Sequence, residues 1–525
     1  MKGSVSWLNE LKGWLGSDAY STAWVAMVPD VNYPDRPAWP KALNYLRTHQ
    51  LDDGGWGEPH VFFAHERTIS TLAAIRALHI WKTLPSDMMQ IRRGLAALRS
   101  YAPRLASEPH QPIGFEMLLP RLRDELAPLF EPELPLSEWA YTDILSREKL
   151  AIVRNLEPNP LVPRAWWVSM EMLQEDHLAR MDDSLLDDIG SIATATAATA
   201  AYLRARRVRG EDSPRAAKYL DGALELGRGA VPFCWPAEIF ERVWALDNFM
   251  RVGLNPNSRS LKSTIESVHT SWNLGEPGLS YNDAFPVNDG DDTLLGYTSL
   301  HWAGFSVSEE PVLAFSNNSH FLAYTDERGA SPSVNIHALS ALRAQPGIPH
   351  RQLARQVSDW LIAHLKPDVM FDDKWHYSPF YSVSHAIPAF TGWDNSVALK
   401  CISFLLDQQR HDGGWGNFGY STLEETALCT IGLYRAFQAD LLTSLEPLVR
   451  AEHFFKINAG QQAVERLWIG KTLFRPDGIV KATLFAAHHA LEKLGLNALA
   501  MHDVRKTSGG VAETLLASRT GRISA

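Results

Sequence analysis

The chain repeats one block of sequence, once near each end. Residues 41–57 read KALNYLRTHQLDDGGWG and residues 400–416 read KCISFLLDQQRHDGGWG, so a glutamine and DGGWG recur at the same offset. A glutamate then opens an apolar segment in each copy, at Glu66 and at Glu425. Each unit is therefore predicted to be a helix, a glycine-rich turn and a second helix. Such hairpins bury their apolar faces only against neighbouring hairpins, so the repeat predicts closed rings of helices.

Hydrogen bonding explains why this block would recur. The glutamine of each copy can bond to backbone groups at a helix end while the tryptophan packs over the turn, which would connect neighbouring hairpins. A weaker third copy is expected in residues 185–203, LLDDIGSIATATAATAAYL. The two strong copies lie far apart, so two rings are expected, with a boundary in GRGAVPFCWP, residues 227–236. Alternating strand patterns are few, so the predicted fold class is all-α.

Composition narrows the class of protein. With 525 residues and a net charge of −10, the chain is too long for a peptide hormone and has no basic block for nucleic acid. The three cysteines lack CxxC spacing, so no disulfide framework or zinc site is expected, and a cytoplasmic location fits. The N-terminus lacks the apolar core of a signal peptide, and no apolar run predicts a membrane span. The 18 Trp, 21 Phe and 14 Tyr can build packed cores or an apolar pocket that stabilises a cation.

An acidic motif precedes one of the expected helices. Asp289, Asp291 and Asp292 stand in DGDDT, followed by LLGYTSLHWAGF. One interpretation is a helix start at which carboxylates cap backbone amides; an EF-hand loop is excluded because Leu294 occupies its glycine position. The other interpretation is a dry cavity in which three carboxylates cannot all be ionised, so that one is held protonated and acts as a Brønsted acid. A carbon–carbon double bond would suit such an acid, because aromatic walls stabilise the resulting cation.

Together with the QxxDGGWG repeats, the DxDDT motif resembles the class II terpene cyclases, and specifically the diterpene cyclases that make bicyclic prenyl diphosphates. Further segments are similar to family motifs in the same order: SDAYSTAW, HERTISTLAAIRAL, PHQPIGFEMLLP, FERVWALDNFMRVGL, SPSVNIHAL, DKWH and LWIGKTLF. The resemblance implies a βγ didomain of two α/α barrels with the cavity at their interface. On this chain the β domain would comprise residues 1–20 plus 235–525, and the γ domain residues 21–234.

The resemblance also implies roles for single residues. Asp291 would be the proton donor, tuned by Asp289 and Asp292. Asn335 would hydrogen-bond the acid and orient its proton, the alternative being an ordinary helix cap. The expected aromatic residues of the cavity wall are Trp235, Tyr281 and Phe285.

A diphosphate in a semi-buried site needs cations, and the resemblance implies Mg2+ as cofactor. The acidic segment that the family carries just before PIGFE has few carboxylates here, which leaves Glu108 and Glu116 as candidate metal ligands. Lys374, Lys471 and Arg67 are candidate diphosphate ligands, although a lone basic residue is often a solvated surface group.

Two missing features bear on the product. The nearest match to the DDxxD motif of the other cyclase class, DDSLLD at residues 182–187, has the wrong spacing, so the product should keep its diphosphate. Enzymes that make ent-copalyl diphosphate position a water with a histidine–asparagine pair, and the aligned positions here are Val168 and Phe233. We therefore expect a bicyclic C20 diphosphate other than ent-copalyl diphosphate, such as a rearranged halimane or clerodane type, with a tyrosine, His376, His385 or a water as proton acceptor.

Several alternatives remain open. The substrate is expected to be geranylgeranyl diphosphate, with farnesyl diphosphate, which would give drimenyl diphosphate, as its competitor. An α/α-barrel glycosidase, a non-catalytic helical-repeat protein and a squalene-type cyclase are rival interpretations, and they fit the aspartate motif or the repeat number less well. A homodimer, and a separate class I synthase or a phosphatase that takes the product, are the expected protein partners.

Overall fold

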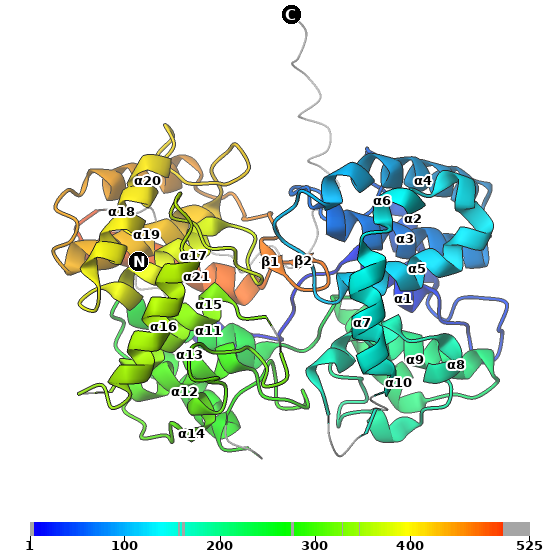
Figure 1. The fold of residues 1–525 in the computed structure, drawn as a ribbon, viewed down its shortest axis with the longest axis horizontal. Coiled ribbons are helices and arrows are strands. Elements are labelled where there is room, and N and C mark those ends of the chain that lie inside the picture. The colour runs from blue at the N-terminus through cyan, green and yellow to red at the C-terminus, as the bar shows by residue number, and fades with distance from the viewer. Residues whose placement is uncertain are drawn as a thin grey trace, which may run out of the picture.

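The computed structural model describes residues 5–155, 158–159, 163–274, 278–327, 329–345 and 347–496. Within these ranges the chain is almost entirely helical, and its two β-strands are two residues each. Figure 1 shows two helical lobes side by side with both strands between them. The predicted all-α class is confirmed.

One lobe contains the C-terminal half of the described chain. Six helices, each packed on the next, form a closed inner ring: α11 (Glu238–Arg251), α13 (Gly290–Trp302), α15 (Pro332–Leu342), α17 (Pro379–Phe390), α19 (Leu423–Gln438) and α21 (Asp477–Lys493). The helices that alternate with them pack outside: α12 (Arg259–Trp272), α14 (Glu310–Leu313), α16 (Arg351–His364), α18 (Asn395–Gln408) and α20 (Glu446–Ile457). The 3-10 helix η1 (Ser6–Glu10) packs on α12. This alternation of inner and outer helices is an α/α barrel.

The other lobe repeats this plan with a shorter ring. Its inner elements, again in contact from one to the next, are α1 (Ala19–Ala26), α3 (Ala64–Trp81), α5 (Phe115–Phe130), the 3-10 helix η3 (Ala165–Met172) and α9 (Thr196–Val208). Its remaining elements are α2 (Pro40–Thr48), α4 (Pro85–Leu105), η2 (Glu131–Glu133), α6 (Leu136–Trp139), α7 (Thr142–Asn155), α8 (Glu175–Leu178), η4 (Asp183–Leu185) and α10 (Pro214–Leu226). The prediction of two helical rings is therefore confirmed.

The repeated block makes the same hydrogen bonds in both lobes. Gln50 Nε2 donates to the carbonyl oxygens of Gly54 and Gln90, each at 2.8 Å, and so ties its turn to the first residues of α4. Gln409 Nε2 donates to Gly413 and to Pro447, at the start of α20. Both tryptophans are fully buried and donate from Nε1 to a backbone carbonyl of the preceding helix, at 2.7 Å. The glutamine and the tryptophan thus connect neighbouring hairpins, as predicted.

Glycine is required at the tip of each turn. Gly413 has φ +90°, and an added Cβ would lie 2.2 Å from the carbonyl oxygen of Arg450. Gly54 and Gly190 have the same conformation and the same kind of close approach, to Arg93 and Arg215. The third copy of the repeat, at residues 185–203, is therefore a real turn, in which Ile192 stands where the other two copies have tryptophan.

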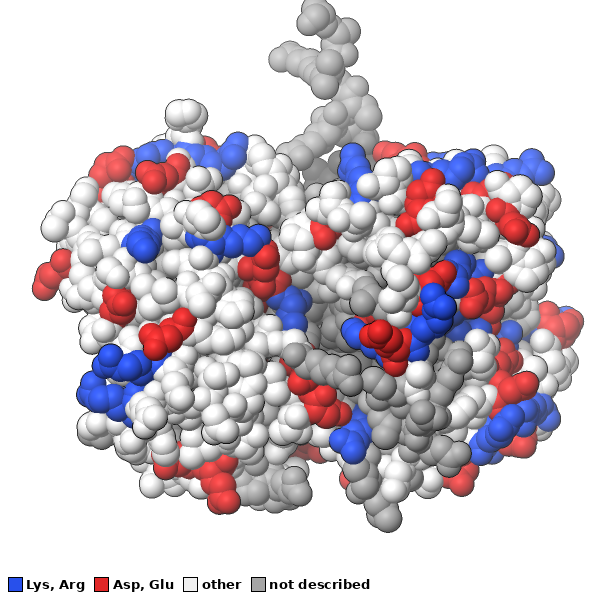
Figure 2. All heavy atoms as spheres, viewed as in Figure 1, with Lys and Arg blue, Asp and Glu red and all other residues white. Residues whose placement is uncertain are grey.

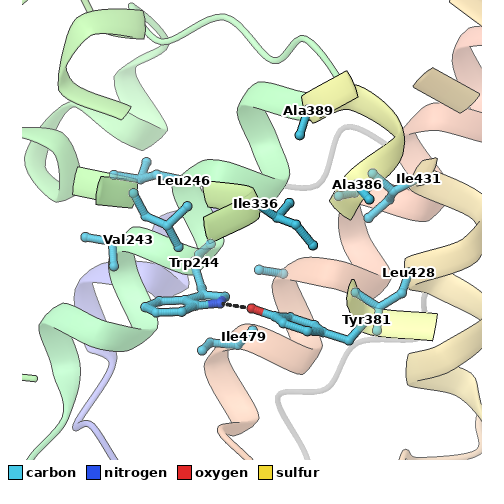
Figure 3. Packing of buried hydrophobic residues seen from close by; sticks show 14 of the residues in the cluster. Val243, Trp244, Leu246, Ile336, Tyr381, Ala386, Ala389, Leu428, Ile431 and Ile479 are labelled. Atoms are coloured by element: carbon cyan, nitrogen blue, oxygen red, sulfur yellow. Dashed lines mark hydrogen bonds between the residues drawn. The ribbon is translucent and has the colours of Figure 1, made fainter. Parts of the chain in front are cut away.

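The two lobes have separate apolar cores. The core of the first lobe gathers buried residues between Val5 and Leu15 and between Phe233 and Leu491, whereas that of the second runs from Ala19 to Val231 and adds Phe285. Figure 3 shows the first core, where side chains from several inner helices meet around the hydrogen bond from Trp244 Nε1 to the Tyr381 hydroxyl, 2.9 Å long. Residues 1–20 plus 235–525 and 21–234 remain our proposal for the domain limits.

A short hairpin connects the lobes. Strand β1 (Trp468–Ile469) pairs antiparallel with β2 (Leu473–Phe474), and Gly470 between them accepts a hydrogen bond from the backbone N–H of Ile113, 2.9 Å long. Lys471, at the hairpin tip, is fully buried and donates to the Val168 carbonyl and to Glu171, each at 2.7 Å. The hairpin therefore belongs to one lobe by sequence and is bonded to the other.

Surface properties agree with the composition. On the face drawn in Figure 2, acidic and basic side chains are interspersed over both lobes, and no continuous basic tract crosses it. None of the helices described here is long and apolar enough to cross a membrane.

Candidate active site

An apolar cavity of about 560 Å³ lies where the inner ring of the C-terminal lobe meets the hairpin. We call it the inner cavity. It is lined by Leu15, Ile113, Phe233, Phe240, Trp244, Tyr281, Asp289, Asp291, Trp375, Tyr381, Trp468, Ile469, Gly470 and Phe474. Most of these side chains are aromatic, and the two aspartates are the acidic groups among them. A carboxyl group in such a wall faces apolar surroundings rather than water.

A second cavity, of about 1150 Å³, adjoins the first. This outer cavity shares Ile113, Phe233, Tyr281 and Trp375 with the inner one, so the two form one passage between the lobes. Its wall also carries charged and polar groups: Gln111, Glu116, Lys149, Asp326, Glu327 and Lys374. The passage is thus apolar at the aspartate end and charged at the other end.

The aspartates begin helix α13. Asp289 is its N-cap, and Oδ1 of Asp289 accepts hydrogen bonds from the backbone N–H groups of Asp291 (2.8 Å) and Asp292 (3.1 Å). The capping interpretation is therefore correct for Asp289, and the cap turns the next two carboxyl groups into the protein interior. Burial, followed by the charge of Asp291, raises the pKa of Asp289 to about 7.

Asp292 is the most deeply buried of the three. It is fully buried, and neither of its carboxylate oxygens has a hydrogen-bond partner among the described residues. Burial and the neighbouring charges of Asp289 and Asp291 raise its pKa well above the usual range of a carboxyl group. Both effects favour the neutral form of Asp292, which limits the negative charge of the cluster.

Asp291 is paired with a histidine that the sequence analysis did not assign. Nδ1 of His337 lies 2.5 Å from Oδ1 of Asp291, and Nε2 of His337 lies 2.8 Å from Nδ1 of His385. Burial, followed by the charge of Arg251, lowers the pKa of His385 well below the usual value for histidine. The result is a buried chain of three groups that ends on one oxygen of the carboxyl group in the cavity wall.

Asn335 does not contact this carboxyl group. Its side chain donates to the carbonyl oxygens of Phe321 (3.0 Å) and Ser331 (2.9 Å) and accepts from the backbone N–H of Phe321 (2.7 Å). The prediction that Asn335 hydrogen-bonds the acid is wrong, because its polar atoms are used to hold the preceding loop. The signal for His337 was present in the same segment, SPSVNIHAL, two residues further on.

Two of the three candidate diphosphate ligands are also wrong. The ammonium of Lys471 is held by Val168 and Glu171 in a fully buried pair. Arg67 donates to Asp53, at 2.9 Å, and to a backbone carbonyl within its own lobe. Neither lines the passage. Lys374 does line the outer cavity, where it is paired with Glu327.

The two candidate metal ligands lie in different places. Glu108 accepts from the backbone N–H of Ala64, at 2.8 Å, and pairs with His65, so it supports the start of α3, and it lines neither cavity. Glu116 lines the outer cavity and pairs with Lys149. No group of three or more His, Cys, Asp and Glu side chains in the part of the chain described here could form a metal cage by itself.

Two of the three aromatic residues predicted for the cavity wall lie in it. Tyr281 lines both cavities and Phe285 the outer one. Trp235 lines neither: its Nε1 donates to the carbonyl oxygen of Lys12 at 3.1 Å and its ring packs near Tyr219. The prediction for Trp235 is wrong, since the ring turns away from the passage.

The positions considered for a terminal base can also be located. Val168 lines the outer cavity, and Phe233 lines both. His376 stacks on Tyr381, with ring centroids 4.5 Å apart, and His385 bonds His337; neither histidine lines the passage. The sequence analysis also missed Trp244, Tyr381 and Trp468, which lie far apart in the chain and share only an excess of aromatic residues as a signal.

Comparison with known proteins identifies the family. The chain is 30% identical over 489 residues to "Type B diterpene cyclase" of Mycobacterium tuberculosis, and the match covers 90% of this chain and 95% of that protein. It is also 30% identical over 366 residues to a chloroplastic isopimaradiene synthase of Picea sitchensis, a match that covers 68% of this chain and 40% of that enzyme. No protein-family model matches the chain.

Solved structures show the same fold. An ent-copalyl diphosphate synthase from Streptomyces platensis aligns with a TM-score of 0.74 at 24% identity, covering 92% of this chain and 97% of that one. Abietadiene synthase from Abies grandis aligns with a TM-score of 0.63 at 21% identity, covering 93% of this chain and 58% of that one. The two helical barrels are thus those of a βγ terpene cyclase. Together with the sequence match over nine-tenths of its length, this shows that the chain belongs to the class II diterpene cyclases.

Proposed function

We propose that the enzyme protonates the terminal double bond of geranylgeranyl diphosphate with Asp291 and releases a bicyclic C20 diphosphate. The observation that carries this proposal is the position of Asp291 in the aromatic wall of the inner cavity, with one oxygen bonded to His337 at 2.5 Å. An alkene has no better basic site than its π electrons, so it reacts only with an acid held in a dry cavity.

The histidine chain orients the acidic proton. A neutral imidazole has one donor and one acceptor, so if Nδ1–H of His337 donates to Asp291, its Nε2 must accept from Nδ1–H of His385. That arrangement leaves the other oxygen of Asp291 to carry the acidic proton. After the proton has left, the His337 hydrogen bond and the N-terminus of α13 stabilise the carboxylate.

Aromatic rings stabilise the cation that follows. The rings of Phe240, Trp244 and Trp468 pack in tilted and edge-to-face contacts, with centroids 4.5 to 6.0 Å apart, in the wall that also carries Asp291. These rings offer negative faces to a tertiary cation and no lone pair that would trap it. The substrate chain can therefore close its rings before it loses a proton.

The charged end of the passage suits a diphosphate. Lys149 and Lys374 supply ammonium groups, and Glu116 and Glu327 are their partners in the outer cavity. Mg2+ bound with substrate phosphates needs only one or two carboxylates, so Glu116 and Glu327 fit it as ligands without a protein cage. Bound there, the ion would neutralise the diphosphate, while the two lysines hold its oxygens.

The diphosphate is retained in this proposal. The acidic run at residues 182–187 serves local turns: Asp182 accepts from the backbone N–H of Ser184, Asp183 from the hydroxyl of Tyr202, and Asp187 from the backbone N–H of Ser191. None of the three lines the passage. The acidic run at residues 182–187 therefore does not place the carboxylate motif of the other cyclase class at the outer cavity.

The product is expected to differ from ent-copalyl diphosphate. Val168 and Phe233 present apolar side chains to the passage, so they cannot hold a water as the base. A cation that is not quenched promptly undergoes hydride and methyl shifts, which favours a rearranged halimane or clerodane skeleton.

A substrate panel tests the proposal. Purified enzyme is incubated with C15, C20 and C30 prenyl substrates and Mg2+, and the products are treated with phosphatase and analysed by chiral gas chromatography and mass spectrometry. We expect a bicyclic C20 alcohol that does not match ent-copalol. A preference for farnesyl diphosphate, turnover of squalene alone, or a match to ent-copalol would each contradict one part of the proposal.

A further inference from the structure

We propose that the Tyr281 hydroxyl is the terminal proton acceptor of the cyclisation and that Tyr324 and Asp289 carry the proton away from it. This inference rests on the proposed function, because it requires a carbocation in the inner cavity. It adds the step that ends the reaction.

Few side chains in the inner cavity could accept a proton. Among its described lining residues, the side chains that carry oxygen are Tyr281, Asp289, Asp291 and Tyr381. Asp291 is assigned to the opposite role at the start of the reaction. The hydroxyl of Tyr381 accepts the hydrogen bond from Trp244 Nε1, at 2.9 Å, and the Tyr381 ring packs edge-on against the ring of His337, with centroids 6.3 Å apart.

Tyr281 differs from Tyr381 in both position and connections. It lines the inner and the outer cavity, so it stands between the acid and the charged end, where the second ring of a bicyclic product would lie. Its backbone carbonyl accepts from the N–H groups of Ile239 and Phe240 at the start of α11, which fixes the ring in the wall.

A hydrogen-bonded path leads from this hydroxyl to a carboxylate. The Tyr324 hydroxyl donates to the Tyr281 hydroxyl oxygen, 3.0 Å away, and a hydrogen bond between Tyr324 and Asp289 lowers the pKa of that carboxyl. Asp289 is held in place by the two backbone N–H groups that it caps, and these stabilise its negative charge. Its pKa of about 7 lets it exist as an anion at neutral pH and still take up a proton.

The step balances without another reactant. A C–H bond next to the cationic carbon breaks, and its electron pair becomes the new C=C bond. The Tyr324 hydroxyl holds a single proton, so it first turns from the Tyr281 oxygen to the Asp289 carboxylate. The proton from carbon then goes to the oxygen of Tyr281, the hydroxyl proton of Tyr281 passes to Tyr324, and that of Tyr324 passes to the Asp289 carboxylate. The tyrosine is never left as a phenolate or as a charged oxonium, and the acidic cluster regains the charge balance that Asp291 changed when it donated.

Tyr281→Phe and Tyr324→Phe test the relay, with Tyr434→Phe as the matched control, since Tyr434 is buried, its hydroxyl accepts from Gln438, and it lines neither cavity. Each is assayed with geranylgeranyl diphosphate and Mg2+ by following substrate loss and product identity. We expect Tyr281→Phe to reduce the wild-type product by about 10²-fold, in the range for loss of a general base, while substrate loss falls less and other double-bond isomers or alcohols accumulate. Tyr324→Phe leaves the cavity wall at Tyr281 in place and should shift the products in the same direction. Tyr434→Phe should keep the wild-type product as its main product.

The outcomes separate this inference from the proposed function. If the wild-type enzyme makes a bicyclic diphosphate and both relay variants make the same product in the same proportions, the relay is wrong and the proposed function stands. The same shift in Tyr434→Phe would also overturn the relay, because any lost buried hydroxyl would then suffice. A wild-type enzyme that releases a hydrocarbon and free diphosphate would overturn both.

Discussion

Asn335 and His337 lie two positions apart on α15 and contact different parts of the protein. Two helical positions differ by about 200° around the axis, so the two side chains face opposite ways. Asn335 bonds the loop at Phe321, and His337 bonds Asp291. The oriented acid therefore depends on the histidine, and the asparagine supports the loop that precedes the helix.

Replacing His337 should affect the chemistry more than the binding of substrate. A hydrogen bond to a charged group contributes about 1.5–3 kcal/mol, so His337→Phe should lower kcat by about 10- to 150-fold with little change in KM. His337→Asn should retain more activity, since its amide N–H can still donate to Asp291. Asn335→Ala, as control, should lower the free energy of unfolding and reduce kcat of the folded enzyme less than His337→Phe does. Equal losses of kcat in His337→Phe and Asn335→Ala would contradict the assignment of His337 as the residue that orients the acid.

Lys374 should act on binding of the diphosphate. Lys374→Ala removes one ammonium from the outer cavity, and the loss of a charge-assisted contact of about 1.5–3 kcal/mol predicts a KM increase of about tenfold or more with kcat little changed. Lys366→Ala is the control, because Lys366 pairs with the exposed Asp372 and lines neither cavity. Steady-state kinetics that show the same KM for both variants would remove Lys374 from the site.

The residues that sequence patterns located are those whose surroundings are local. Asp289, Asp291 and Asp292 were found because a helix start places them together whatever the rest of the chain does. Lys471 and Trp235 were misjudged because their contacts, Glu171 and Lys12, come from segments far away in the sequence. A basic or aromatic side chain carries no sign of which distant group it will meet.

At the scale of the elements, the DGGWG turn is the unit that both barrels share. Its glutamine, glycine and tryptophan bond to backbone atoms, so the turn is the same wherever the block occurs. This independence from side-chain context is the reason that the hairpins and the ring closure could be predicted. The passage could not be predicted, because its walls come from α11, α13 and α17 of one lobe, from α5, α7 and η3 of the other, from the hairpin and from loops.

Two glycine-to-alanine variants near this turn separate the cost of a left-handed backbone conformation from the cost of a steric clash. Gly419→Ala changes a residue with φ +84° and open space around it, so we expect a loss of about 1–2 kcal/mol in the free energy of unfolding. Gly413→Ala adds a Cβ at 2.2 Å from a backbone oxygen, so it should cost about 1–3 kcal/mol more. Urea unfolding of the two variants measures the difference. Equal losses in the free energy of unfolding would show that the turn can relax around the added Cβ, so that a steric clash is not the reason for glycine at position 413.

For the whole molecule, the contact between the lobes determines the site, since the passage has walls from both. The fully buried pair of Lys471 and Glu171 crosses this contact beside Val168. Removing one partner of a buried ion pair leaves an uncompensated charge and costs about 3–5 kcal/mol. Lys471→Met should therefore destabilise the protein by this amount.

The double variant provides the control for that prediction. Lys471→Met with Glu171→Leu removes both charges, so part of the lost free energy of unfolding should return. Thermal and urea unfolding of the single and double variants measure the coupling. If the second substitution only adds to the loss, the pair does not stabilise the contact between the lobes through its charges.

The most direct test of the account follows one deuteron in one turnover. Enzyme equilibrated in D2O is mixed with less than one equivalent of geranylgeranyl diphosphate, and the intact product is analysed by mass spectrometry, with Asp291→Asn as the matched variant. If Asp291 starts the reaction, the product is a cyclic isomer that keeps its diphosphate and carries a single deuterium from the acid. Asp291→Asn should then lose at least about 10²-fold in rate. A product without deuterium, a product without its diphosphate, or an Asn variant with more than about a tenth of the wild-type rate would contradict the central claim.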